Sequence, residues 1–368
     1  DGTIGWGMGA LDEREALPGC LATAAQSATN ARSLRILVVS DAWRPQVNGV
    51  VRTLGMVNAE LIARGDVVEV IGPDRFISFP TPGYAEIRLA LAPRRRLARL
   101  AEEFRPDVVH ISTEGPLGWA MRGICLKRGW RFTTSFHTKF PEYLHARTRI
   151  PVAWSWALMR HFHQAGEGTF CATPSLAREL RSRGFTKVIP WSRGVDLDRF
   201  HPDMDRHDAA EDWESLPRPI FLYAGRDAVE KNIEAFHGLD LPGSKVVVGD
   251  GPQRTALMKR YPAAHYTGWR SNGALARAYA AADVFVFPSR TDTFGLVLLE
   301  SLASGTPVAA YPVTGPVDVI GDAAVGALDA DLRAACLKAL SADRAACRRH
   351  AEAYAWAACA RRFRDSLV

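Results

Sequence analysis

Short hydrophobic runs alternate with helical patterns along the first half of the chain. Runs rich in β-branched residues cover 35–43, 66–74 and 107–113, and amphipathic helical patterns cover 50–65 and 97–106. The runs are apolar along their whole length, which is typical of parallel strands whose two faces are both covered by helices. The pattern therefore predicts a doubly wound α/β fold.

The same pattern begins again at Pro219, after a polar stretch without apolar periodicity. We predict two Rossmann-like domains, at 34–195 and at 219–368, joined by a linker at 196–218. The second domain includes C-terminal helices, and residues 1–33 are expected to form a flexible leader. Because open α/β sheets bind ligands at the carboxyl ends of their strands, the two domains are expected to face a central cleft.

The composition is that of a globular protein, with 47% hydrophobic and 23% charged residues in 368. The six cysteines are scattered without a CxxC pair or a zinc-ligand spacing, which favours a reducing compartment. The longest nearly uncharged apolar run, Pro151 to Met159, is too short to cross a bilayer. Residues 34–195 carry 24 basic and 13 acidic side chains, an excess that attracts phosphates of nucleic acid or of an anionic lipid surface.

The strongest candidate site lies at 283–307, where a buried strand precedes a polar loop and a helix that opens near Phe294 or Gly295. The amides and the dipole at a helix start suit a phosphate or a sugar hydroxyl. Asp292 and Glu300 are eight residues apart, so they lie on nearly the same helix face. Together they could hold hydroxyls of two parts of one ligand; taken singly, a helix cap and a solvated charge explain them equally well.

This segment resembles the signature of glycosyltransferase family 4, which comprises retaining nucleotide-sugar enzymes of the GT-B fold, with two Rossmann domains. The similarity is to the branch of diacylglycerol-lipid glycosyltransferases and GDP-mannose-dependent mannosyltransferases. It implies that Asp292, shorter than the family's usual glutamate, holds donor-sugar hydroxyls and that Glu300 binds the ribose. It also implies that the pyrophosphate and sugar contact the amides of Phe294, Gly295 and Leu296.

Arg226 and Lys231 follow the first strand of the second domain, where a pyrophosphate could sit. Cations there stabilise a departing nucleoside diphosphate, which gains charge as the glycosidic bond breaks. They resemble the family's paired Arg and Lys, and with Asp292 and His137 they are the predicted catalytic residues. The neighbouring Asp227 would repel a phosphate unless its carboxylate points away.

In the first domain, Asn48 and Gly49 occupy the loop between the first strand and helix, and the resemblance implies that Gly49 abuts the donor phosphate or anomeric carbon. His137 follows a strand and could hydrogen-bond a donor hydroxyl or share a proton with the leaving diphosphate. It resembles the family's cleft histidine. Arg193 resembles a residue of the closing strand that lines the cleft.

Three DxD triplets, at 196–198, 203–205 and 329–331, have the form of a divalent-metal motif. None of them follows a buried strand that ends at a cleft, so turn and cap roles are favoured. We expect catalysis without a metal and without any other cofactor.

The segment 140–164 resembles family members that act on lipid acceptors. Its apolar and basic side chains interleave, and a basic triplet lies elsewhere in the domain: Trp154, Trp156, Leu158 and Phe162 with Arg149, Arg160 and His163, and then Arg94, Arg95 and Arg96. Such chemistry suits an anionic membrane surface, and the competing interpretation is a core helix with basic ends. We predict a peripheral protein on the cytoplasmic face of the membrane.

The predicted function is retaining transfer of a hexosyl group to a lipid acceptor of diacylglycerol type, from UDP-hexose, UDP-glucuronate or GDP-mannose. A soluble sugar acceptor is one alternative, and a nucleotide-sugar epimerase of the same architecture is another. Nucleic acid is not an expected partner, because the sequence contains neither a stacking-aromatic motif nor a reading helix.

Overall fold

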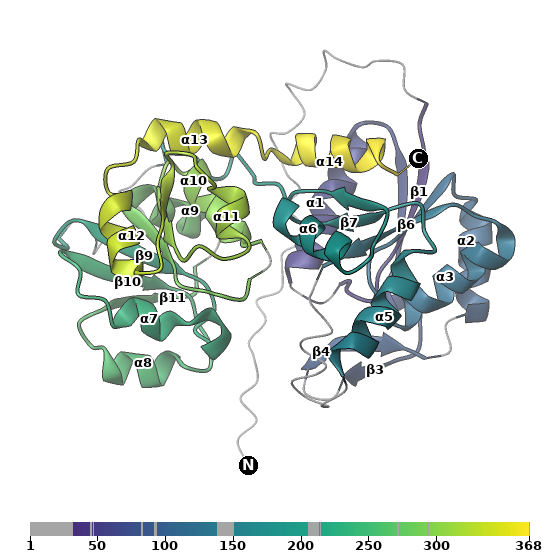
Figure 1. The fold of residues 1–368 in the computed structure, drawn as a ribbon, viewed down its shortest axis with the longest axis horizontal. Helices are drawn as coiled ribbons and strands as arrows, with labels where there is room; N and C mark the ends of the chain where they lie inside the picture. Colours follow the sequence, from purple (N-terminus) through teal and green to yellow (C-terminus); the bar gives the residue numbers. More distant parts are fainter. Residues whose placement is uncertain are drawn as a thin grey trace. The chain divides into compact units, whose positions relative to one another are not determined.

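The computed structural model describes residues 32–44, 46, 48–81, 84–91, 94–137, 151–204, 213, 215–270, 272–292 and 294–367. The predicted leader, 1–33, lies almost entirely outside them. The described chain contains two six-stranded parallel sheets, as the repeated hydrophobic pattern predicted (Figure 1).

The first sheet has the strand order β2-β1-β5-β6-β7-β8. Its strands are β1 Arg35–Val39, β2 Val67–Ile71, β5 Val108–Ile111, β6 Phe132–Phe136, β7 Thr169–Cys171 and β8 Val188–Pro190. The accompanying elements are α1 Gly49–Ala63, η1 Pro73–Arg75, the hairpin of β3 Ser78–Thr81 and β4 Tyr84–Ala90, α2 Arg94–Phe104, α3 Pro116–Arg128, α5 Val152–His163 and α6 Pro174–Ser182.

The second sheet has the order β11-β10-β9-β12-β13-β14. Its strands are β9 Ile220–Ala224, β10 Ser244–Val248, β11 His265–Gly268, β12 Val284–Phe287, β13 Val308–Ala310 and β14 Gly326–Leu328. The helices are η3 Val229–Lys231, α7 Ile233–His237, α8 Arg254–Arg260, α9 Asn272–Ala281, α10 Leu296–Ala303, α11 Pro316–Val319, α12 Leu332–Ala339, α13 Arg344–Glu352 and α14 Trp356–Asp365.

Strand β1 shows why the hydrophobic runs are uninterrupted. Successive side chains of a strand point to opposite faces of the sheet. Ile36 and Val38 accordingly pack with Leu54 of α1, whereas Leu37 packs in a separate cluster with Leu117 of α3. Both faces of the strand are buried from Ile36 to Val39, so these four positions are apolar, whereas Arg35 at its start is exposed.

Helix α14 packs against the first sheet's helix α1, although it follows the whole second sheet in sequence (Figure 1). Trp356 and Phe363 share a buried cluster with Ile36 of β1. The Arg364 guanidinium binds the buried carboxylate of Asp66, with Nε 2.7 Å from Oδ2 and Nη2 3.0 Å from Oδ1. The sequence analysis assigned this helix to the second domain because it follows that domain in the chain.

The predicted linker is not entirely a solvent-exposed connection. Phe200 and Trp213 are buried in the core of the second sheet. Val195 donates a backbone hydrogen bond to the Tyr354 carbonyl at 2.8 Å, so the two chain segments that connect the sheets run side by side here. Phe200 and Trp213 are isolated among polar residues, so the segment shows no apolar periodicity that would have predicted their burial.

Within the described residues, no helix combines the length and the apolar character needed to cross a membrane.

Candidate active site

Both sheets have a topological switch point, where ligands of open α/β sheets bind. In the first sheet it lies between β1 and β5, and in the second between β9 and β12. Asn48 and Gly49 follow β1, Arg226 follows β9, and Asp292 follows β12. Asn48 and Asp292, more than 200 residues apart in the sequence, thus both lie at the carboxyl end of a strand beside a switch point.

The loop after β1 leaves open space in front of α1. Asn48 caps the helix, with its Oδ1 accepting from the amides of Val50 and Val51, each at 3.0 Å. A Cβ added to Gly49 would meet nothing within 4 Å. Packing within the described protein therefore does not require this glycine, and the open space agrees with close approach of a ligand.

His137 follows β6 and is held as a neutral imidazole. Arginine has no acceptor, so Arg193 Nη2 donates to Nδ1 at 3.0 Å, and Nε2 must carry the proton that it donates to Ser112 Oγ at 3.0 Å. Burial, followed by the Arg193 charge, lowers the pKa of His137 well below its usual value. The lowered pKa disfavours proton sharing, one of the two roles expected for His137. Both ring nitrogens already have partners, so a hydrogen bond to a donor hydroxyl would have to replace or share the Ser112 contact.

Arg193 is itself buried, with its guanidinium 4.8 Å from the Trp191 ring centroid. Burial lowers its pKa to about 10, so it remains charged at neutral pH. We assign it to orienting His137, with its contact to a donor remaining a prediction.

The Lys231 ammonium and the Asp292 carboxylate form an ion pair, with Nζ 2.7 Å from Oδ1. Lys231 ends η3, and the next residue, Asn232, donates from Nδ2 to the Pro288 carbonyl at 3.0 Å, which ties η3 to the loop after β12. Asp292 Oδ2 is buried and accepts no hydrogen bond from any residue that the structure describes. A sugar hydroxyl could satisfy that oxygen, as the resemblance implies.

Arg226 is exposed directly after β9, and the Tyr223 hydroxyl donates to its carbonyl at 2.7 Å. The neighbouring Asp227 is fully buried, with neither carboxylate oxygen bonded to a described residue. Burial raises the pKa of Asp227 to about 6, with Arg254 opposing and Asp250 adding to the shift. The carboxylate is turned into the protein, which answers how it can adjoin a phosphate site.

Glu300 is buried in α10 and is not a solvated helix charge. Its Oε2 accepts from the Tyr279 hydroxyl at 3.5 Å, and its Oε1 lies 2.6 Å from Arg52 Nη1 of α1. This ion pair joins the second sheet's candidate site to the first. Sequence reasoning missed Arg52, although it lies one helical turn beyond Gly49 and so shares its face of α1.

The loop before α10 places Phe294, Gly295 and Leu296 at the helix start, close to the predicted position. Gly295 has a φ of 82°, in the left-handed region that favours glycine, and Leu296 is the first helical residue. The first amides of a helix have no partner within it, so they are available to a pyrophosphate.

The DxD triplets serve as turns and caps where they are described. Asp196 accepts from the Arg199 amide at 3.0 Å, Asp329 from the Asp331 amide at 2.9 Å, and Asp331 from the Arg333 amide at 2.9 Å. Metal independence remains a prediction.

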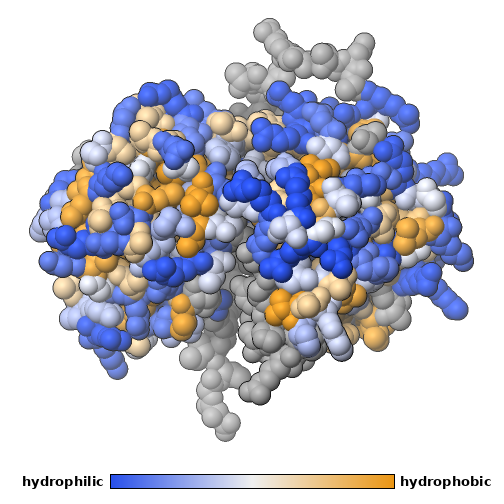
Figure 2. Space-filling view, in the orientation of Figure 1, coloured by the Kyte–Doolittle hydropathy of each residue, from blue (hydrophilic) through white to orange (hydrophobic). Residues whose placement is uncertain are grey.

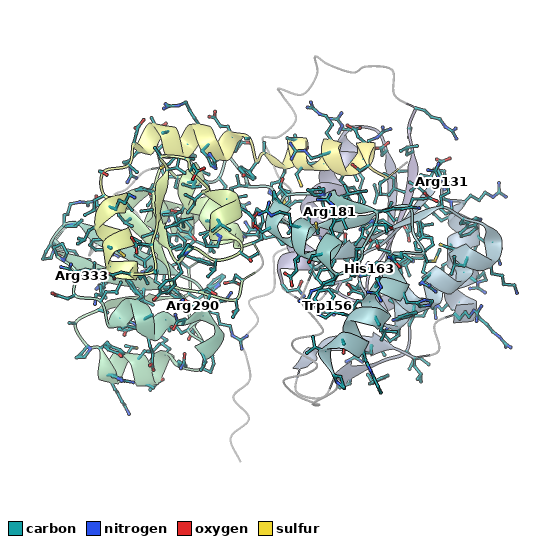
Figure 3. All side chains as sticks on the ribbon, in the orientation of Figure 1. Arg131, Trp156, His163, Arg181, Arg290 and Arg333 are labelled. Atoms are coloured by element: carbon teal, nitrogen blue, oxygen red, sulfur yellow. The ribbon has the colours of Figure 1, made fainter. Side chains whose placement is uncertain are left out.

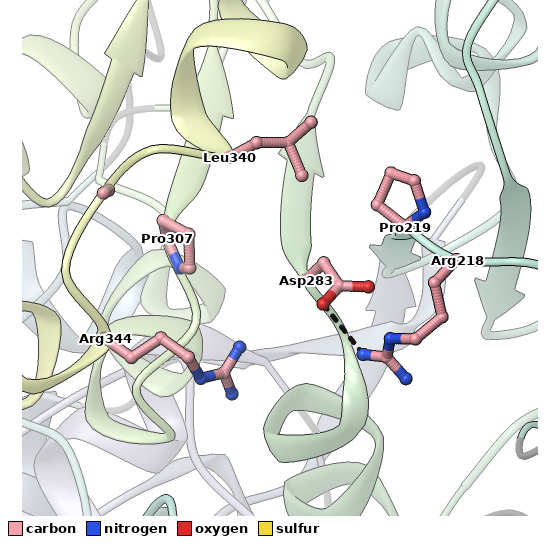
Figure 4. A pocket seen from close by; sticks show the side chains of 7 residues that line it. Arg218, Pro219, Asp283, Pro307, Leu340 and Arg344 are labelled. Carbon is pink, nitrogen blue, oxygen red and sulfur yellow. Dashed lines mark hydrogen bonds and ion pairs between the residues drawn. The ribbon is translucent and has the colours of Figure 1, made fainter.

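A separate cavity of about 400 Å³ lies at the opposite edge of the second sheet, near the amino ends of β9 and β12 (Figure 4). Its charged groups are engaged internally. Arg218 Nη2 lies 2.8 Å from Asp283 Oδ1, and Arg344 donates to the carbonyls of Ala280 and Ala282 at 2.8 and 2.7 Å. This edge carries none of the predicted donor residues.

Helix α5 presents fewer aromatic residues than its sequence suggested. Trp156, Phe162 and His163 are buried, and His163 Nδ1 lies 2.8 Å from Thr134 Oγ1. Figure 3 labels Trp156 and His163, which both belong to this helix. Trp154 is 74% exposed and Leu158 is 48% exposed. The core-helix interpretation therefore holds for one face of α5, and Arg149 lies outside the described residues.

Residues 47–199 match a family model described as Glycosyltransferase Family 4, and residues 218–343 match one described as Glycosyl transferases group 1. A GDP-mannose-dependent alpha-mannosyltransferase of Mycobacterium tuberculosis is 32% identical over 78% of this chain and 81% of its own length. The chain belongs to glycosyltransferase family 4.

This family 4 member is thus a glycosyltransferase that uses a nucleotide-sugar donor, as predicted. It is also similar to the alpha-monoglucosyldiacylglycerol synthase of Streptococcus pneumoniae, at 29% identity over 84% of this chain and 79% of that protein. Sucrose-phosphate synthase from Thermosynechococcus elongatus superimposes with a TM-score of 0.67 at 19% identity, covering 91% of this chain and 98% of the other. The fold is GT-B.

Proposed function

We propose that this glycosyltransferase moves a hexosyl group, with retention of configuration, from UDP-hexose, UDP-glucuronate or GDP-mannose to a lipid acceptor of diacylglycerol type. The observation that carries the proposal is the Lys231–Asp292 pair beside the N-terminus of α10, with Glu300 buried on the same helix. Adjacent segments then supply three groups for the donor: the Lys231 ammonium for the diphosphate, the Asp292 carboxylate for the sugar and the Glu300 carboxylate for the ribose. The names of the two relatives support a lipid or mannosyl reaction.

In the proposed mechanism the acceptor oxygen attacks the anomeric carbon on the face from which the diphosphate departs. The bond from C1 to the phosphate oxygen breaks, the bond from C1 to the acceptor oxygen forms, and the acceptor proton moves to the departing phosphate oxygen. His137 is a poor base for that proton, because Arg193 occupies Nδ1 and Nε2 is already protonated. Lys231 and Arg226 would stabilise the charge that grows on the diphosphate.

A surface in the first domain supports a membrane-borne acceptor. Ile77, Phe79 and Leu91, on and beside the β3–β4 hairpin, are 80%, 46% and 59% exposed. The exposed triplet Arg94–Arg96 begins α2 next to them. Exposed apolar residues beside clustered arginines fit an interfacial position on anionic lipid at the cytoplasmic face.

The test is a panel of UDP- and GDP-sugars, screened for stabilisation against heat and then for transfer to a lipid extract. We expect one donor to raise the melting temperature, to label a lipid product and to give the same anomeric configuration in product as in donor by NMR. Inverted configuration would overturn retention. Conversion of the donor without an acceptor would favour an epimerase, and labelling of soluble sugars alone would favour a soluble acceptor.

Replacing Arg94, Arg95 and Arg96 with serine should reduce co-sedimentation with anionic vesicles several-fold, and raising salt should do the same to the wild type. Exposed charges are screened over about 8 Å at physiological ionic strength, whereas apolar insertion survives salt.

A matched control replaces three exposed cations of the second domain with serine: Lys259, Arg260 and Lys338. The surface over α6, which carries exposed Arg178 and Arg181, is also hydrophilic (Figure 2). Replacing these two arginines with serine is a second control for the loss of surface charge. Equal, negligible binding of the wild type to anionic and neutral vesicles would contradict membrane docking.

A further inference from the structure

A cavity of about 260 Å³ lies in the first domain, at the carboxyl ends of β1 and β2. Its walls come from the loop after β1, from η1 after β2, and from the β3–β4 hairpin. The cavity lies at the ligand-binding edge of its sheet, unlike the cavity of the second domain.

The cavity is lined by two arginines and one aspartate, which makes it suited to an anion. Arg44 is exposed, and its guanidinium carbon lies 6.0 Å from the centroid of the Trp43 ring. It makes no hydrogen bond or ion pair with a residue that the structure describes. Arg88 donates from Nε to Ser78 Oγ at 2.9 Å and from Nη2 to the Ser78 carbonyl at 2.6 Å. Arg44 is therefore the cation available to a ligand, while Arg88 also holds the hairpin.

Oxygen groups in the same cavity suit a hydroxylated ligand. Asp74 is partly exposed, and its carboxylate is 3.9 Å from Arg75, a weak pairing at the surface. The Ser78 hydroxyl also borders the cavity. A carboxylate and a hydroxyl recognise sugar or polyol hydroxyls, and the positive excess recognises a carboxylate or phosphate on the same molecule.

Gln46 connects the cavity to the predicted donor loop. It is buried, donates from Nε2 to the Asp41 carbonyl at 3.1 Å, and accepts at Oε1 from Asn48 Nδ2 at 3.3 Å. Asn48 in turn caps α1 beside Gly49. A headgroup in the cavity would therefore lie one side chain away from the loop expected to contact the anomeric carbon.

The hairpin that forms one wall has two chemically different faces. Side chains alternate along a strand, so Ser78 borders the cavity while its neighbours Ile77 and Phe79 lie exposed on the other face. The Leu91 amide donates to the Ile77 carbonyl at 2.8 Å, which brings exposed Leu91 beside them. The apolar side suits acyl chains, and the polar side suits the headgroup that those chains carry.

We propose that this cavity is the acceptor subsite and that it takes an anionic sugar or polyol headgroup of a lipid, with Arg44 binding the carboxylate or phosphate of that headgroup. The inference rests on the proposed function and specifies its acceptor. Arg44 is then a specificity-determining residue, which contacts the acceptor and does not contact the donor.

The experiment compares Arg44→Gln with the wild type on two acceptors that differ by one charge, glucuronosyl- and glucosyl-diacylglycerol in neutral vesicles, with the donor identified by the panel. Arg44→Gln should raise KM for the glucuronosyl lipid about tenfold, the loss of one charge-assisted contact. The KM for the glucosyl lipid, kcat and the donor KM should stay within twofold of wild type. Arg99→Gln removes an exposed arginine of the same domain outside the cavity and should change none of them.

Equal effects of Arg44→Gln on both lipids, or no effect on either, would overturn the assignment. A second measurement, NMR titration with methyl glucuronide, separates the headgroup from its lipid: weaker binding to Arg44→Gln than to wild type supports the subsite, and equal binding overturns it. Comparable catalytic efficiency on methyl glucuronide and on the glucuronosyl lipid would overturn the lipid source. Failure of the wild type to glycosylate any lipid would refute the proposed function, while the titration still decides the cavity's role.

Discussion

Replacing Lys231 with methionine is expected to lower kcat about a hundredfold, with a smaller change in donor KM. The Lys231 ammonium is paired with Asp292 next to the start of α10, where negative charge accumulates as the diphosphate leaves. Removal of one preorganised charge stabiliser typically costs 10²–10³ in kcat. Steady-state kinetics at saturating acceptor, with single-turnover rates, measures the effect on the transfer step.

The matched control for this variant is Lys259→Met, which removes an exposed lysine of α8. Because Lys231→Met also leaves Asp292 without its cation, the double variant with Asp292→Asn should remain as slow as Lys231→Met. Recovery in the double variant would show that the lone carboxylate caused the loss. An unchanged kcat with a raised donor KM would mean that the cation binds ground state and transition state equally.

Replacing Glu300 with glutamine should weaken nucleotide-sugar binding about thirtyfold, while the melting temperature of the free protein changes little. Hydrogen bonds to a charged group contribute about 1.5–3 kcal/mol each, and the ribose loses a charged acceptor in this variant. Glutamine keeps the size of the buried side chain and its acceptor for the Tyr279 hydroxyl. Isothermal titration with the nucleoside diphosphate and with the intact donor measures the loss.

Arg52→Met separates ribose binding from the ion pair between the two sheets. In the absence of ligand, Arg52 occupies one oxygen of Glu300, so its removal should leave nucleotide affinity unchanged or higher. An affinity loss in Arg52→Met as large as that in Glu300→Gln would assign the effect to the ion pair and contradict a direct ribose contact.

The fold followed from the sequence because both faces of each sheet are buried. Ile36 and Leu37 pack on opposite faces of β1, so the strand is apolar from Ile36 to Val39. The repeated alternation of such short runs with amphipathic helical patterns indicated parallel strands. Asp292 and Glu300 were recognisable for a similar reason, since their spacing is local and lies within one loop and helix. The local pattern located both features, and the resemblance to family 4 supplied the roles expected of the two carboxylates.

The features that were missed depend on contacts between distant segments. The Lys231–Asp292 ion pair spans 61 residues, and each side chain had been given a separate role. Trp156 and Trp154 have the same chemistry two residues apart, yet the helix buries one and exposes the other. Composition cannot distinguish such positions until the orientation of α5 against its sheet is known.

The return of α14 to the first sheet sets the order in which the chain can mature on a ribosome. Domains emerging early in synthesis can normally fold as units before the rest is made. Here Ile36 and Leu54 are covered by Trp356 and Phe363, which are translated only after the entire second domain. The nascent first domain therefore carries an open apolar face until residues 356–367 emerge, and a segment synthesised after the second domain completes the core of the first.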